Sequence, residues 1–247
     1  MLNATIHFIE TTDSTNRYLA DMAAGKMKDS SKIQDFTVVY THKQTAGRGM
    51  GTNQWHSDEG QNILASFYFE PDIDASQQFF FNRFFALAVR DMISKYVPAL
   101  IKWPNDIIVD HHKIAGILIE HSVVGNRLAH SIAGVGININ QTSFRADIPH
   151  PTSLKLMTGQ DYDVENLLNE LVTSCQEYYK TLKEGKLDAL ETEYLQHLYR
   201  LNEPAAYQYQ NERITATITG IDPYGRLTLR KEDGTLLTCG YKEIVFL

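Results

Sequence analysis

Alternating and continuous runs of apolar residues predict a chain of strands interrupted by a few helices. Short apolar runs predict strands at 4–9, 36–42, 62–70, 99–103, 107–109, 114–124 and 127–140. Apolar residues at helical spacing predict helices at 77–96, 164–185 and 187–201. Asp13 and Ser14 are predicted caps of an earlier helix that stops at Gly25, Ser76 is a predicted cap of the 77–96 helix, and Pro204 is the predicted end of the last helix.

The segment 101–120 places a lysine at the end of an apolar strand. Lys102 follows Ile101, and Pro104, which has no backbone N–H, closes the strand before a polar turn. The runs 107–109 and 114–124 then complete a predicted antiparallel hairpin. A lysine beside a tryptophan also fits a surface side chain that reaches into water, so this segment alone leaves both interpretations open.

A glycine-rich loop follows the strand at 36–42. Gly47, Gly49 and Gly51 alternate with Arg48 and Met50, which lets the backbone approach a ligand and turns several N–H groups toward one anion. Arg48 adds a planar fork that suits phosphate or carboxylate. A flexible turn without a ligand is the alternative, because the loop matches neither the Walker pattern nor the dinucleotide fingerprint.

Polar side chains elsewhere suit the same site. Ser14 and Thr15 stand at a predicted helix start, where capping and ligand binding can coexist. Asn138 follows two glycines of the 127–140 strand, which mark a close approach by backbone or ligand. The adjacent pair His111–His112 lies in a polar turn and is predicted to be solvated, so we expect no metal site there.

The composition is ordinary for a globular protein, with 43% hydrophobic and 21% charged residues. The net charge of -7 argues against a surface that neutralises many nucleic-acid phosphates. Since no apolar stretch reaches the roughly 18 to 20 residues of a membrane span and no signal sequence is visible, we expect a cytoplasmic protein with no membrane partner. Cys175 and Cys239 lack CxxC spacing and are expected to be reduced thiols.

We expect two domains, at residues 1–203 and 204–247. The second segment contains only strand and turn patterns. Because so short a segment rarely folds alone without disulfides, it is expected to pack against the first domain.

Arg48 and Lys102 come from separate strand–loop junctions, and together they suit the binding of two anions. Two cations at one site offset repulsion between a carboxylate and a triphosphate and stabilise charge that develops at phosphorus. The expected chemistry is therefore phosphoryl or nucleotidyl transfer.

Five motifs, in this order, resemble the biotin protein ligases of the bacterial type without a DNA-binding domain. They are DSTN at 13–16, QTAGRG at 44–49, KWPND at 102–106, KIAGILIE at 113–120 and GVGININ at 134–140. The glycine and EI pattern at 220–244 resembles the SH3-like domain of that family, so the resemblance spans nearly the whole chain. It implies an α+β fold, with a class II synthetase-like mixed or antiparallel sheet flanked by helices, followed by a small SH3-like β-barrel.

The resemblance also implies an ATP-dependent ligase. Such an enzyme forms biotinoyl-AMP from biotin and MgATP and then transfers biotin to a lysine of a biotin carboxyl carrier protein. Mg²⁺ is expected to be carried by the substrate phosphates, with no protein ligand assigned. The identity of the carrier and the oligomeric state stay open, and a homodimer through a sheet edge is compatible with the sequence.

The family's motifs assign roles to particular residues of this chain. Lys102 and Arg48 would be catalytic, with Lys102 reaching the carboxyl and α-phosphate oxygens. The implied biotin-binding residues are Ser14, Thr15, Asn16, Gln44, Gly47, Arg48, Gly49, Met50, Lys102 and Gly116. The implied ATP-binding residues are Arg48, Gly51, Trp55, Asn105, Lys113 and Asn138.

Two departures and two rivals limit the resemblance. Many relatives have arginine where Met50 stands, so one phosphate contact is expected to be missing. DSTN begins at residue 13, which leaves no room for a preceding helix-turn-helix module, and we expect no repressor activity. The rivals are a lipoate or octanoate protein ligase, disfavoured by KWPND with the SH3-like tail, and a non-catalytic biotin sensor, disfavoured by retention of Lys102 and Arg48.

Overall fold

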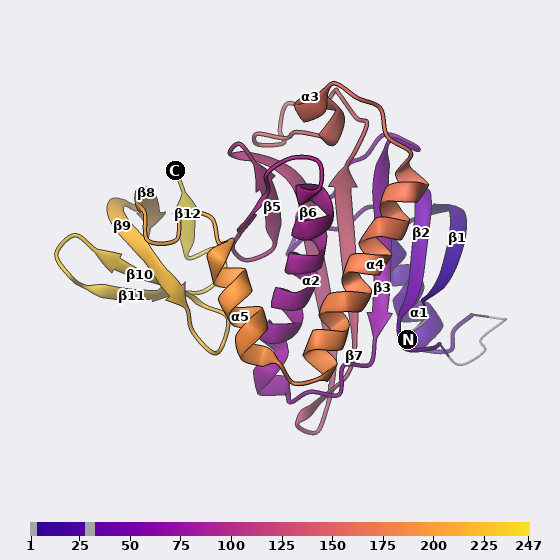
Figure 1. Ribbon diagram of the computed structural model, residues 1–247, viewed down its shortest axis with the longest axis horizontal. Coiled ribbons are helices and arrows are strands. Elements are labelled where there is room, and N and C mark those ends of the chain that lie inside the picture. Colours follow the sequence, from indigo (N-terminus) through magenta and orange to yellow (C-terminus); the bar gives the residue numbers. More distant parts are fainter. Residues whose placement is uncertain (1–3, 28–32) are drawn as a thin grey trace.

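The computed structural model describes residues 4–27 and 33–247 and arranges them around two β-sheets (Figure 1). The seven strands of the large sheet lie in the order β1-β2-β3-β7-β6-β5-β4. Their bounds are β1 Thr5–Thr12, β2 Thr37–Gln44, β3 Asn62–Phe69, β4 Leu100–Lys102, β5 Asp106–Val109, β6 His112–Val124 and β7 Arg127–Asn138. Only the pairing of β1 with β2 is parallel among these described strands, so the sheet is mixed, as expected from the resemblance.

Helices cover both faces of the large sheet. Helices α2 (Gln78–Ser94) and α4 (Val164–Lys183) lie side by side on one face, and α1 (Thr15–Ala23) packs on the other (Figure 1). Neighbouring residues of β2 show why both faces are apolar: Val38 joins the main core, whereas Val39 packs with Leu19 of α1. Successive side chains of a strand point to opposite faces, so a fully apolar strand needs a helix on each side.

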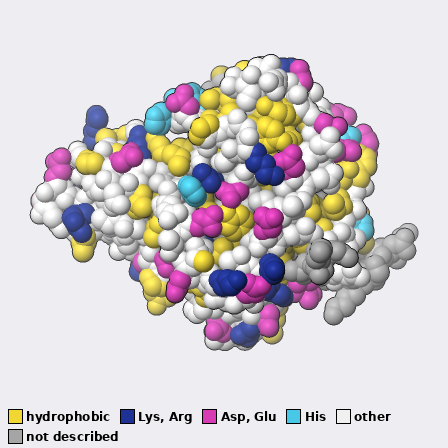
Figure 2. Space-filling model, in the orientation of Figure 1, with side chains coloured by type: hydrophobic (Ala, Val, Ile, Leu, Met, Phe, Trp, Pro, Cys, Tyr) yellow, Lys and Arg dark blue, Asp and Glu magenta, His cyan; other side chains and the backbone are white. Residues whose placement is uncertain are grey.

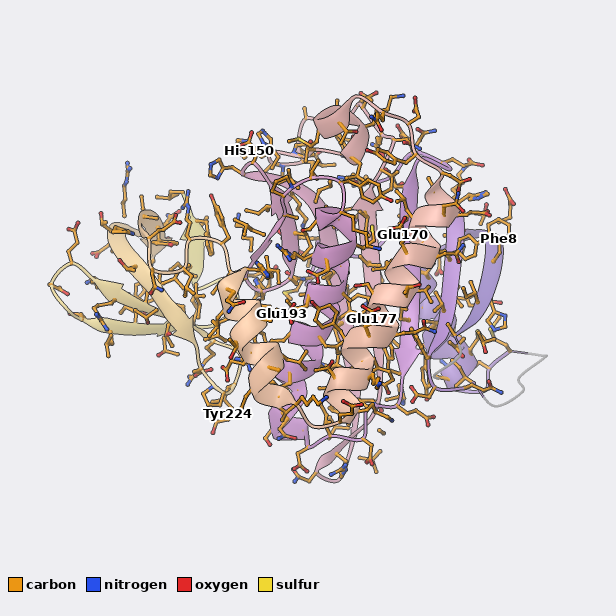
Figure 3. All side chains as sticks on the ribbon, viewed as in Figure 1. Phe8, His150, Glu170, Glu177, Glu193 and Tyr224 are labelled. Carbon is orange, nitrogen blue, oxygen red and sulfur yellow. The ribbon has the colours of Figure 1, made fainter. Side chains whose placement is uncertain are left out.

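The aromatic stripe of α2 forms much of the main core, as its helical spacing predicts. Phe81, Phe84 and Phe85 are fully buried and contact Phe69 of β3 edge-on. Strand β3 is itself buried along its whole length, which confirms its central place in the sheet. The opposite situation holds at the sheet edge, where Phe8 of β1 is 45% exposed (Figure 3).

The predicted hairpin forms the other end of the large sheet. Strands β4, β5 and β6 pair antiparallel, and Lys102 stands opposite Asp106 across the turn that contains Pro104. Lys102 is thus held at the very end of a short strand, next to the turn.

The second sheet is antiparallel and begins at Pro204, after helix α5 (Leu187–Gln196). Its strands lie in the order β11-β10-β9-β8-β12, with bounds β8 Pro204–Tyr209, β9 Glu212–Ile221, β10 Leu227–Lys231, β11 Leu236–Cys239 and β12 Ile244–Phe246. The indole N–H of Trp103 donates to the carbonyl oxygen of Gly225 at 2.9 Å, which ties the small sheet to the hairpin. Because the second sheet begins at Pro204, we propose that the chain divides into two domains, 1–203 and 204–247.

Several local predictions differ from the structure. Ser14 occupies the N-cap position of α1, but its side chain accepts no capping hydrogen bond. Ser76 lies inside a 3₁₀ turn (η1, Ala75–Gln77) that precedes α2, and so does not cap α2. Helix α5 ends at Gln196, and Pro204 instead opens β8, a position where its missing N–H is tolerated. The short helix α3 (Leu154–Thr158) had no prediction.

Acidic and basic side chains are interspersed over the helical face (Figure 2). Helix α4 directs Glu170 and Glu177 outward from this face (Figure 3), and Glu170 pairs with Lys95 of the segment after α2 at 2.9 Å. No helix in the described part of the chain is long and apolar enough to cross a membrane.

Candidate active site

A cavity of about 370 Å³ lies between the large sheet, the glycine-rich loop and the small sheet. It brings together residues that the sequence separates by more than 200 positions. The predicted site residues that line it are Ser14, Thr15, Asn16, Gln44, Arg48, Gly49, Met50, Trp55, Lys102, Asn105, Lys113 and Gly116.

Three predicted site residues lie outside the lining of this cavity. Gly47 lines a neighbouring surface pocket, and a Cβ there would stand 2.4 Å from the carbonyl oxygen of Trp55. Gly51 lies beside the ammonium of Lys242. Asn138 is buried and donates its Nδ2 to the carbonyl oxygen of Thr152 at 2.9 Å, so its amide is engaged within the fold.

Hydrogen bonds connect the polar side chains around the start of α1. The backbone N–H and the hydroxyl of Thr15 both reach Oε1 of Gln44, at 2.9 and 3.2 Å. The hydroxyl of Ser66 lies 2.6 Å from Oδ1 of Asn16 and 2.7 Å from the hydroxyl of Thr15. Ser14, Thr15 and Asn16 are buried, so this group of residues forms a desolvated polar wall. Such a wall suits a neutral polar ligand group with both donors and acceptors.

Arg48 is bound to a carboxylate that the sequence analysis did not assign. Its Nη1 and Nη2 donate to the two oxygens of Glu120 at 3.2 and 2.9 Å. Nδ2 of Asn16 donates to the same carboxylate at 2.8 Å. The glycine-rich loop is therefore connected to β6 and to the polar wall through one acidic side chain.

The lysines of the cavity have different partners. Lys113 forms an ion pair with Asp106 at 2.6 Å and stands over the ring of Trp55, 5.8 Å from its centroid. The ammonium of Lys102 lies 5.0 Å from the centroid of Phe246 and has no hydrogen-bond acceptor among the residues that the structure describes. Lys102 thus presents unused N–H donors to the cavity.

Burial lowers the pKa of Lys102, and Asp106 opposes that shift while the positive charges of Lys113 and Arg200 add to it. A partly desolvated ammonium between other cations is stabilised by any anion that enters the cavity. Lys102 is therefore suited to bind an anion rather than water.

Two glycines of β7 form part of the cavity floor. A Cβ on Gly134 would stand 2.1 Å from Oδ1 of Asn16, and one on Gly136 would stand 2.2 Å from the ring of Trp55. Both distances are far shorter than a van der Waals contact, so the side chains of Asn16 and Trp55 lie directly on the backbone of β7. The indole N–H of Trp55 is buried and has no partner among the described residues.

Part of the lining was missed from the sequence. The loop contributes Asn53 and Gln54, and the small sheet contributes Tyr241, Lys242, Ile244, Val245 and Phe246. No ligand-binding role was predicted for these residues, and their place in the site follows from the packing of one sheet against the other.

Metal-binding groups are scarce in this part of the fold. No three His, Cys, Asp or Glu side chains gather into a metal-binding cluster within residues 4–27 and 33–247. Asp106, the carboxylate that lines the cavity, is paired with Lys113.

Comparisons with known proteins agree on one family. The model described as the biotin/lipoate A/B protein ligase family matches residues 8–138. The bifunctional ligase/repressor BirA of Bacillus spizizenii is 29% identical over 205 residues, which cover 80% of this chain and 62% of that protein. The biotin--[acetyl-CoA-carboxylase] ligase of Paracoccus denitrificans is 27% identical over 231 residues, which cover 90% of this chain and 93% of that protein.

The fold is also that of a solved ligase. Biotin protein ligase from Aquifex aeolicus, in complex with biotin and ATP, superposes with a TM-score of 0.78, covers 98% of each chain and is 23% identical. The chain spans about 62% of the length of the Bacillus relatives that it matches.

Proposed function

The chain belongs to the biotin/lipoate A/B protein ligase family, and on this premise we propose that it activates biotin with ATP as biotinoyl-AMP and transfers biotin to a lysine of a biotin carboxyl carrier protein. The observation that carries the proposal is the cavity that joins the polar wall at Thr15 and Gln44 to the ammonium of Lys102, which finds no hydrogen-bond acceptor in the described part of the chain. One cavity thereby offers a place for a neutral polar ring and a place for anions.

Activation answers a chemical need. A carboxylate resists attack by an amine, whereas an acyl adenylate carries a good leaving group and must be kept from water. The carboxylate of biotin attacks the α-phosphorus of ATP, and pyrophosphate leaves. The lysine amine of the carrier then attacks the acyl carbon, and AMP leaves. Lys102 is the residue that we assign to both anions, because a cation between them offsets their repulsion and stabilises the charge that builds at phosphorus.

The remaining roles follow the geometry of the cavity. Ser14, Thr15 and Gln44 would bind the ureido ring of biotin through the polar wall. Trp55 and Lys113, which pack against each other, would bind the nucleotide. Lys113 is already neutralised by Asp106, which leaves Lys102 as the stronger attractor of phosphate.

We propose that Mg²⁺ reaches the cavity on the phosphates of ATP, where it would neutralise charge on the leaving pyrophosphate. Asp106 is the carboxylate that lines the cavity and acts electrostatically on Lys102, and it would face the hydrated ion. The side chains otherwise act by binding and orienting the two substrates.

Biotin-dependent exchange of labelled pyrophosphate into ATP, measured without a carrier protein, tests the proposal. Wild-type protein should show exchange with biotin, and Lys102→Ala should lower its rate by at least about 100-fold, since one lost charge stabiliser typically costs that much. Lys231→Ala, in the small sheet and outside the cavity lining, is the matched control and should match the wild type.

The same assay separates the rival functions. If exchange depended on lipoate or octanoate and not on biotin, the substrate would be that acid rather than biotin. Tight biotin binding without any exchange would instead indicate a sensor, and either result would refute biotin ligation.

A further inference from the structure

Glu120 of β6 is the acidic side chain around which the polar part of the cavity is connected. It binds Arg48 through both of its oxygens and Asn16 through one of them. Glu120 is the last residue of the KIAGILIE motif, but the sequence assigned it no role in the site. Glu120 thus contacts both the glycine-rich loop and the first turn of α1.

Glu120 does not compete for the ligand's space. Among the described residues that line the cavity, Arg48 and Asn16 are present and Glu120 is not. The carboxylate therefore approaches the guanidinium from outside the cavity. A guanidinium has five N–H donors, and Glu120 uses two of them, so three remain for the oxygens of a ligand.

The two partners differ in how firmly they are held. Glu120 lies in β6, where its backbone pairs with Ile132 of β7, and its carboxylate is fixed by the buried amide of Asn16. Arg48 lies in a loop outside the large sheet. On either side of Arg48 the loop's backbone hydrogen bonds stay within the loop, from Gly49 to Asn53 and from Trp55 to Gly47, beside the bridge between Arg48 and Gln54. The fixed group consequently orients the group on the loop.

Stability alone does not explain the pair. The side chains of Arg48 and Glu120 are 42% and 39% exposed, and ion pairs with that much solvent access contribute little to folding. A bidentate geometry, however, fixes the plane of the guanidinium as well as its distance.

We propose that Glu120 is a positioning residue for adenylation, which acts through Arg48 and holds its guanidinium at the wall of the cavity. The inference rests on the proposed function and adds a residue to it. With Glu120 in place, Arg48 is oriented before the triphosphate binds. The conformational entropy of the Arg48 side chain is then already lost before the reaction and does not add to its barrier.

The test combines Glu120→Gln with Arg48→Ala in the pyrophosphate exchange assay. Glutamine keeps an oxygen for Asn16 but loses the charge that holds Arg48. We expect the kcat of Glu120→Gln to fall by about 10- to 100-fold, as a misplaced catalytic group does, while the Kd for biotin changes less than about twofold. In the Arg48→Ala background, Glu120→Gln should produce no further loss, because the group through which it acts is gone.

Controls separate this role from folding and from the proposed function. Glu59→Gln breaks a comparable exposed ion pair with Lys43 and should leave exchange unchanged. Glu120→Asp keeps the charge but withdraws it from Arg48, and it carries the same expectation if Glu120→Gln does not fold. Wild-type exchange is measured alongside, and its absence would refute the proposed function rather than the role of Glu120.

Three results would overturn the inference while biotin ligation stands. A kcat within twofold of wild type would show that Arg48 needs no support. A fall in the KM for ATP with an unchanged or higher kcat would show that Glu120 competes with phosphate for Arg48. A full additional loss in the Arg48→Ala background would show that Glu120 acts independently of it.

Discussion

Burial lowers the pKa of single side chains in β6 as well as in the cavity. His121 follows Glu120, and its ring contacts the hydroxyl of Ser131 at 2.8 Å and the edge of Phe81. Burial lowers the pKa of His121 from 6.5 to about 4. The ring is therefore neutral in the folded protein at a pH where an unfolded chain would protonate it.

This difference predicts a loss of stability in acid. Below pH 6.5 the unfolded state takes up a proton that the folded state refuses until about pH 4. The free energy of unfolding should therefore decrease as the pH falls through this window, with His121 contributing on the order of 2 kcal/mol. Urea unfolding of wild type and His121→Gln at pH 7 and pH 4.5 measures it, and the variant should lose less stability between the two values.

A matched variant keeps that comparison specific. His7 lies exposed on the edge strand β1, so His7→Gln should leave the pH dependence unchanged. His130 and His197 also have lowered pKa values because of burial, and they are present in every variant. Equal losses in wild type and His121→Gln would contradict the prediction.

At the level of elements, β7 supports the two halves of the cavity through two glycines. Gly134 leaves room for the side chain of Asn16, and Gly136, two residues further along β7, leaves room for that of Trp55. Residues at this spacing lie on the same face of a strand. The strand therefore supports the proposed biotin end at one position and the proposed nucleotide end at the other.

Substitution of each glycine by alanine should therefore raise the KM for a different substrate. Gly134→Ala displaces Asn16 and should raise the KM for biotin by about tenfold or more, whereas Gly136→Ala displaces Trp55 and should raise the KM for ATP by a similar factor. Steady-state pyrophosphate exchange with each substrate varied in turn measures both constants.

Each variant serves as a control for the other, and Gly240→Ala adds a third comparison. A Cβ on Gly240 would meet its nearest neighbour, Glu243, at 3.4 Å, which is ordinary contact. Its two KM values should stay near those of wild type. If Gly134→Ala and Gly136→Ala raised the same KM, the assignment of the two ends would be wrong.

At the level of the whole molecule, the small sheet supplies a wall of the cavity. Phe246 of β12 places its ring under the ammonium of Lys102. A cation over an aromatic ring is stabilised by about 0.5 to 2 kcal/mol, most strongly where water is excluded. The second sheet thus orients a residue of the first.

Phe246→Leu tests this dependence without removing the apolar wall. We expect kcat/KM for ATP to fall about 3- to 10-fold, because Lys102 loses the ring that holds its ammonium in place. The melting temperature should change little. Leu236→Ala in β11, where Leu236 is 69% exposed, is the control, and an equal loss in that variant would indicate a general effect on the small sheet.

Local patterns along the chain were enough to predict most of the elements. Strand β3 and helix α2 followed from the spacing of their own apolar residues, and the hairpin around Lys102 followed from a proline and two polar turns. The mixed sheet and the small second sheet followed from the resemblance. The individual strands, the helix and the hairpin depend on residues that are close in sequence, where spacing and backbone preference act directly.

Contacts between distant segments decided the rest. Glu120 pairs with Arg48, Phe246 contacts Lys102, and the buried Asn138 is bonded to Thr152. No pattern in the sequence predicts these contacts. Such contacts arise when separate sheets and loops pack to bury apolar surface and satisfy polar groups. The chemistry of the cavity therefore depends on packing, because packing selects which charges meet and which remain free for a ligand.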